Sequence, residues 1–129
     1  MKARFTIPGR LDGLNQMIGA ARSHWAKSAR QKRQATDSVR WILAAARLPQ
    51  FTAPVRVTFT WIEPNAGRDI DNISAGAKPI LDALVAERRL ADDSRAHVRE
   101  LVHLFPDPDL RNPRIEVLIE ELPREGTCD

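Results

Sequence analysis

The chain has 129 residues, a length that suits one domain with a single hydrophobic core. Its 43% hydrophobic and 29% charged residues are ordinary for a globular protein, and no run approaches the roughly 18 apolar residues of a membrane span. The N-terminal segment lacks the apolar stretch of a secretory signal, and the single cysteine, Cys128, excludes an internal disulfide. We therefore expect a cytoplasmic protein with no membrane partner.

The first half of the chain predicts a strand, a loop and a long basic helix. Residues 4–7 form the expected strand, which Pro8-Gly9 ends, and the loop at 10–19 contains Asn15. Residues 20–48 form the expected helix, which Pro49 ends. It combines an apolar stripe with seven Lys or Arg against one Asp between positions 21 and 47. The stripe consists of Ala35, Val39, Ile42, Leu43 and Ala46.

The second half predicts a strand, a helix and two further strands. In the strand at 55–61, Val55, Val57, Phe59 and Trp61 alternate with polar residues. The helix that follows carries an apolar face of Ile73, Ala77, Ile80, Leu81, Leu84 and Val85. Pro79 lies inside this segment, so either the helix starts close to it or an earlier turn is kinked. Strands are expected at 98–105 and around Ile115, Val117 and Ile119.

The predicted element order is β-α-β-α-β-β. The economical packing is an α+β fold, with one mixed sheet and two helices covering one face. We expect one domain over residues 1–122 and a flexible tail over 123–129. Trp41 and Trp61 are assigned to the core or an interface, and His97 and His103 to the strand surface.

Two pairs of aspartates are candidate metal ligands. Asp69 and Asp71 follow the turn chemistry of residues 63–67, so an extended conformation is expected, in which both side chains point the same way. Mg²⁺ is commonly bound by one or two carboxylates plus water. Asp92 and Asp93 follow the second helix, and the chain is long enough to return there. The last ligand could come from the same chain or from a partner subunit, and either pair could instead cap a turn.

Other site chemistries have less support in the sequence. His24, His97 and His103 do not form a zinc-binding or HExxH pattern, and one cysteine excludes a thiolate site. The glycines do not form a phosphate-binding loop, and we expect no organic cofactor. The carboxylates therefore remain the leading candidate site.

The stretch from residue 67 to residue 98 resembles the core motif of the RusA family of Holliday junction resolvases. The matching parts are Arg68-Asp69-Ile70-Asp71-Asn72, Lys78, Leu81-Asp82-Ala83-Leu84 and Asp92-Asp93-Ser94. In the shorter form of this family the lysine lies four residues after the second Asp, where this chain has Ala75. Lys78 lies seven residues after Asp71, so the chain resembles a longer, phage-like form with three inserted residues.

The resemblance implies a homodimeric, Mg²⁺-dependent endonuclease that makes paired nicks in four-way DNA junctions, with Mn²⁺ as a possible substitute. It assigns metal binding to Asp69, Asp71 and Asp93, with Asp92 as the alternative to Asp93. These residues would bind one or two metal ions. Lys78 would contact the scissile phosphate or stabilise the transition state; otherwise it is a solvated helix lysine.

Two asparagines and the basic residues complete the expected site. Asn72 would orient the loop or bind a metal-bound water, or it would cap a helix; Asn15 has a supporting place near the first strand. Backbone phosphates would be bound by Lys27, Arg30, Lys32, Arg33 and Arg68, although such charges are also typical of a solvated helix face. Trp25 could stack on a base or lie in the core or dimer interface.

The expected function is resolution of Holliday junctions in DNA recombination and repair, at the nucleoid. Two alternatives stay open. One is a Mg²⁺-dependent nuclease that acts on other branched or flap DNA. The other is a non-catalytic DNA-binding protein in which the acidic residues only cap loops.

Overall fold

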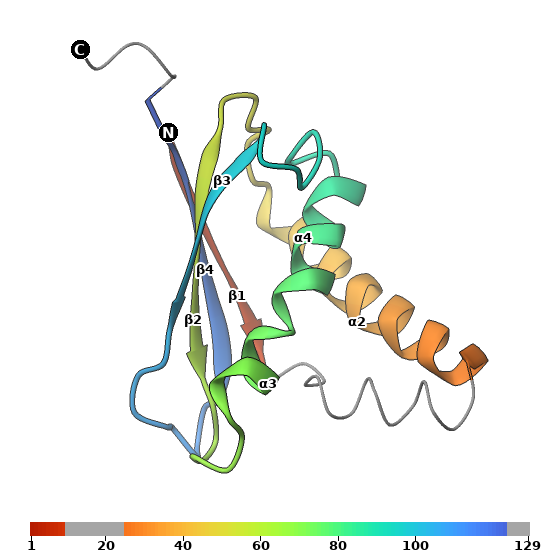
Figure 1. Cartoon of the computed structure of the whole chain (residues 1–129), viewed down its shortest axis with the longest axis vertical. Helices are drawn as coiled ribbons and strands as arrows, with labels where there is room; N and C mark the ends of the chain where they lie inside the picture. Colours follow the sequence, from red (N-terminus) through yellow and green to blue (C-terminus); the bar gives the residue numbers. More distant parts are fainter. Residues whose placement is uncertain (10–24, 124–129) are drawn as a thin grey trace.

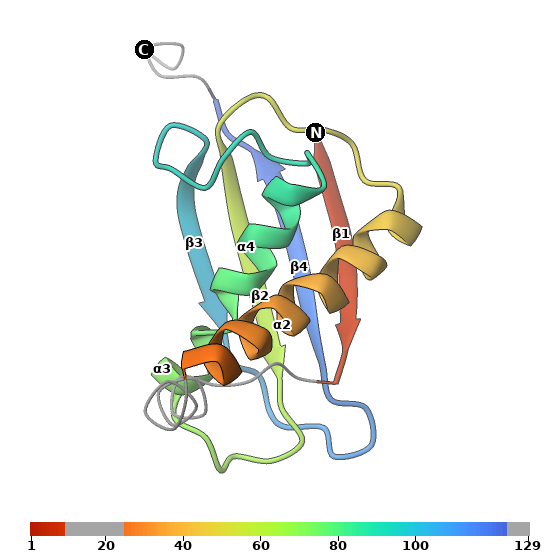
Figure 2. The same ribbon diagram turned by 90° about the vertical axis from the view of Figure 1, so that its right-hand side faces the viewer.

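The computed structural model describes residues 1–9 and 25–123 (Figure 1). Its elements, in chain order, are β1 (Lys2–Pro8), α2 (Trp25–Ala46), β2 (Val55–Ile62), α3 (Ile70–Ser74), α4 (Ala77–Ala86), β3 (Val98–Leu104) and β4 (Arg114–Glu121). The four strands form one mixed sheet, and α2 and α4 cover one of its faces, as both views show (Figures 1 and 2). The predicted α+β class and its two covering helices are confirmed.

The sheet has the order β1-β4-β2-β3. β4 pairs antiparallel with both β1 and β2, whereas β2 and β3 are parallel. A parallel pair needs a crossover connection, and here α3 and α4 provide it. This topology places the segment with Asp69 and Asp71 after the carboxyl end of β2, and the segment with Asp92 and Asp93 before β3.

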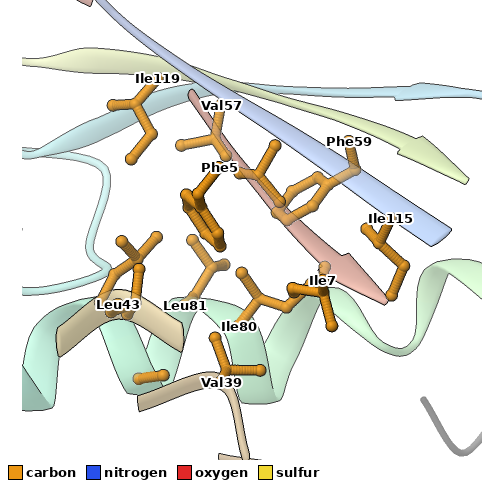
Figure 3. Packing of buried hydrophobic residues seen from close by; sticks show 14 of the residues in the cluster. Phe5, Ile7, Val39, Leu43, Val57, Phe59, Ile80, Leu81, Ile115 and Ile119 are labelled. Carbon is orange, nitrogen blue, oxygen red and sulfur yellow. The ribbon is translucent and has the colours of Figure 1, made fainter. Parts of the chain in front are cut away.

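The core lies between the sheet and the two helices, as Figure 3 shows. In β2 the inward residues Val55, Val57, Phe59 and Trp61 are all buried, as their alternation predicted. The same period in β1 and β4 adds Phe5, Ile7, Ile115, Val117 and Ile119, and the helices add Val39, Leu43, Ile80, Leu81 and Leu84. Burial of so much apolar surface is the main force that holds this layer together.

The segment predicted as one helix forms two helices, because the helix is interrupted around Gly76, between α3 and α4. A Cβ atom at Gly76 would lie 3.1 Å from the ring of Trp61, so glycine allows the backbone to approach this buried side chain. α4 begins at Ala77, two residues before Pro79, which confirms a helix start close to the proline. Its missing N–H costs nothing in the first turn.

α2 ends at Ala46, two residues before the predicted end, and Arg47 adopts a positive φ of 53° there. Trp61 is buried, whereas Trp41 is 79% exposed on α2, so its assignment to the core is wrong and its place in an interface stays a prediction. The loop at 10–19 with Asn15, and residues 124–129 of the predicted tail, lie outside the described residues. None of the helices described is long and apolar enough to cross a membrane.

Candidate active site

Asp69 and Asp71 lie at the start of α3, with both residues exposed. Asp69 immediately precedes the helix in an extended conformation (φ −73°, ψ 155°), but Asp71 is already in its first turn. The expectation that both lie in extended chain is therefore wrong for Asp71. Within the described part of the chain, the Asp69 carboxylate makes no capping hydrogen bond to α3. Negative charge at a helix N-terminus is favourable, so this position also has a purely structural explanation.

The arginine before Asp69 is held by a buried glutamate. Arg68 donates two hydrogen bonds to Glu63, from Nε to Oε1 at 2.8 Å and from Nη2 to Oε2 at 2.7 Å. Their side chains are only 15% and 7% exposed, respectively. A bidentate pair of this kind fixes the guanidinium and compensates the buried carboxylate. Arg68 therefore anchors the turn before Asp69, a role the sequence did not predict, and its contact with DNA stays a prediction.

Lys78 contacts one carboxylate of the predicted site, Asp93, and one carboxylate of its own helix, Asp82. Its Nζ donates to Asp93 Oδ2 at 3.0 Å, across fifteen positions of sequence, and lies 3.0 Å from Asp82 Oδ1 on the same helix. The hydrogen bond to Asp82, followed by that to Asp93, raises the pKa of Lys78. The ammonium therefore stays charged. Its side chain is 67% exposed, so its role at a phosphate and the alternative of a solvated helix lysine both stay predictions.

The neighbouring carboxylates Asp92 and Asp93 have different contacts. Asp92 Oδ1 accepts a hydrogen bond from the Ser94 backbone N–H at 2.8 Å, which closes a local turn. Hydrogen bonding to Ser94 lowers the pKa of Asp92, and His97 Nε2 lies 3.8 Å from its other oxygen. The turn-capping alternative therefore holds for Asp92, whereas Asp93 reaches across to Lys78.

Carboxylates are suitable ligands for a hydrated magnesium ion, but the three predicted ones, Asp69, Asp71 and Asp93, do not come together. Among residues 1–9 and 25–123, no group of three or more potential ligand side chains is placed to bind one metal. Asp69 and Asp71 are exposed carboxylates, and one or two such ligands with water suffice for Mg²⁺. Asp93 accepts a hydrogen bond from Lys78 instead.

His103 has a half-buried place that the sequence did not predict. It stacks with Phe59 and with Phe105, at centroid distances of 5.3 and 6.5 Å, and its Nδ1 accepts a hydrogen bond from Trp61 Nε1 at 2.9 Å. Burial lowers the pKa of His103. His103 therefore lies on a strand, as assigned, but its side chain is only partly exposed. No local pattern could have found it, because it depends on the register that pairs His103 of β3 with Phe59 of β2.

Apart from Arg68, the predicted DNA-binding residues lie on α2. Arg30 and Arg33 are exposed on this helix, whereas the side chains of Trp25, Lys27 and Lys32 lie outside the described set. Asn72 is the third residue of α3 and not its cap, so the capping alternative is wrong. Asn72 is half-buried, and its predicted role in supporting the site of the adjacent aspartates stays a prediction.

A scan against models of protein families finds no match to this chain, and a search of curated proteins finds no similar sequence.

Proposed function

We propose that this chain is a Mg²⁺-dependent endonuclease that resolves four-way DNA junctions by paired nicks. The observation that carries the proposal is the contact between Lys78 Nζ and Asp93 Oδ2 at 3.0 Å. The resemblance to the RusA family assigned both residues to one site, from separate motifs. A chance likeness in a loop would not require these two side chains to meet.

The arrangement of charges supports phosphodiester cleavage. Asp69 and Asp71 present exposed carboxylates to a hydrated ion, and Arg68 holds the turn before them. Mg²⁺, when bound, would neutralise charge on the phosphate and lower the pKa of a water. Lys78 donates to the phosphate oxygens, and Arg30 and Arg33 on α2 bind the flanking backbone. Symmetric nicking of two strands requires a homodimer.

The test is the isosteric removal of each carboxylate charge at the start of α3. We expect Asp69→Asn and Asp71→Asn to abolish nicking of a four-way junction in Mg²⁺, while binding to that junction in EDTA is retained. Asp107→Asn is the matched control, because Asp107 is an exposed aspartate in the connection between β3 and β4. A wild-type protein that binds junctions but never nicks them, in Mg²⁺ or Mn²⁺, would contradict the enzyme and favour the non-catalytic DNA-binding protein.

Substrate choice separates the junction resolvase from a nuclease for other branched DNA. Rates are compared on four-way, three-way, flap and linear DNA of the same sequence. The proposal expects paired nicks on the four-way junction to be the fastest reaction, and gel filtration to show a dimer. Faster cleavage of a flap would replace the proposed substrate and keep the proposed chemistry.

A further inference from the structure

We propose that Asp82 is a positioning residue that holds Lys78 in the active site, a role that rests on the proposed function. Lys78 Nζ lies 3.0 Å from both Asp82 Oδ1 and Asp93 Oδ2. Asp82 is one helical turn further along α4, whereas Asp93 comes from the segment before β3. The ammonium therefore bridges the helix and the loop, and Asp82 is its fixed partner.

Helix stability does not explain why a lysine occupies this position. Lys78 is the second residue of α4, at the positive end of the helix dipole, where a cation is unfavourable. It directly precedes Pro79, and the residue before a proline is disfavoured in helical conformation. The order Lys then Asp at i and i+4 is also the weaker of the two orders for stabilising a helix. The helix accepts a costly residue here, which indicates a function for its charge.

Asp82 is suited to hold a flexible side chain because its own backbone is fixed. Its neighbours Leu81 and Ala83 are both buried in the core. Lys78 is 67% exposed, so packing does not select its rotamer. An exposed lysine samples many rotamers unless a fixed partner restricts it. The bond to Asp82 selects those in which the ammonium also reaches Asp93.

The geometry leaves Lys78 able to act on a substrate. An ammonium has three donors, and the two carboxylates use two of them. The third can donate to a phosphate oxygen. When DNA or a metal ion draws Asp93 away, Asp82 still holds Lys78 over the site. Its contribution is therefore to orient the lysine, and Asp82 itself touches neither substrate nor metal.

The experiment compares Asp82→Asn and Asp82→Glu, each in the wild-type and in the Lys78→Gln background. The first readout needs no activity: the NMR order parameter of the Lys78 ammonium in EDTA falls in Asp82→Asn and is retained in Asp82→Glu. The second is the split between kcat and KM on a four-way junction. Asp82→Asn lowers kcat about 10- to 100-fold with KM little changed. Asp82→Glu keeps most of the wild-type kcat. In the Lys78→Gln background, Asp82→Asn lowers kcat no further.

The matched control is Glu87→Gln, which removes the ion pair between Glu87, the residue just after α4, and Arg40 of α2 and leaves kcat unchanged. An unchanged Lys78 order parameter in Asp82→Asn would overturn the positioning role, whether or not the protein cleaves DNA. A loosened Lys78 with full kcat would overturn the contribution of Asp82 to the reaction. If the wild type nicks no DNA in Mg²⁺ or Mn²⁺, the proposed function fails and the catalytic role of Asp82 fails with it. The order parameter then still decides whether Asp82 holds Lys78.

Discussion

The core under α4 and the charged surface residues that we call the rim (Asp69, Asp71, Lys78, Asp82 and Asp93) are organised in opposite ways. In the core, side chains such as Phe59 and Leu84 are fully buried and held by contacts on every side. On the rim, Lys78 and Asp93 are 67% and 38% exposed, and Lys78 is held by two polar contacts of 3.0 Å, to Asp82 and Asp93. Exposed ion pairs contribute little to stability. The rim can therefore change its contacts, or lose a charge, without unfolding the domain.

The strongest way to test this contrast is to cut a cavity in the core. Leu84 is completely buried on α4, so Leu84→Ala should lower the free energy of unfolding by about 2–5 kcal/mol. Urea denaturation followed by circular dichroism measures this change. Val85→Ala, at a half-buried position on the same helix, is the control and should cost clearly less. Equal losses would mean that α4 is not packed as described.

The pair between Glu63 and Arg68 lies between the two regions in burial, and we expect an intermediate effect. Glu63→Gln keeps the size of the side chain but removes the charge that accepts both guanidinium bonds. We expect a loss of about 1.5–3 kcal/mol in urea denaturation. Glu100→Gln is the control, because Glu100 pairs with Arg56 on exposed parts of β3 and β2. A loss of stability no larger than that of the control would mean that this pair contributes as little as an exposed ion pair.

Local sequence pattern predicted the core far better than the rim. The alternation of Val55, Val57 and Phe59 defines a buried strand face from neighbouring residues alone. The predicted conformation of Asp71 was wrong, because the sequence of a turn before a helix looks the same as that of a turn before extended chain. The bond between Lys78 and Asp93 depends on how the crossover between β2 and β3 returns, which no local period specifies. Only the family resemblance brought these two residues together in advance.

His103 shows the same limit and predicts a smaller, pH-dependent effect. Burial lowers its folded-state pKa, so the folded protein binds fewer protons than the unfolded chain. The stabilising difference is complete above the unfolded pKa of about 6.5 and is lost as the pH falls toward the folded pKa. Tm measured from pH 7.5 to 5 should therefore fall less in His103→Gln than in the wild type. His97→Gln is the control; equal pH dependence in His103→Gln and wild type would contradict the half-buried place of His103.

The smallest effect on stability is expected on the rim, at Asp93. Asp93→Asn should change the free energy of unfolding by no more than about 0.5 kcal/mol, because its partner Lys78 is exposed and keeps Asp82. Nicking of a four-way junction should nevertheless be lost if Asp93 belongs to the site. Asp92→Asn is the matched neighbour: Asp92 closes a turn through Ser94, so its loss should leave nicking largely intact. If only Asp92→Asn lost nicking, Asp92 would be the site carboxylate and Asp93 would not. A large loss of stability in Asp93→Asn would show that the rim is part of the folded framework, and the contrast with the core would not hold.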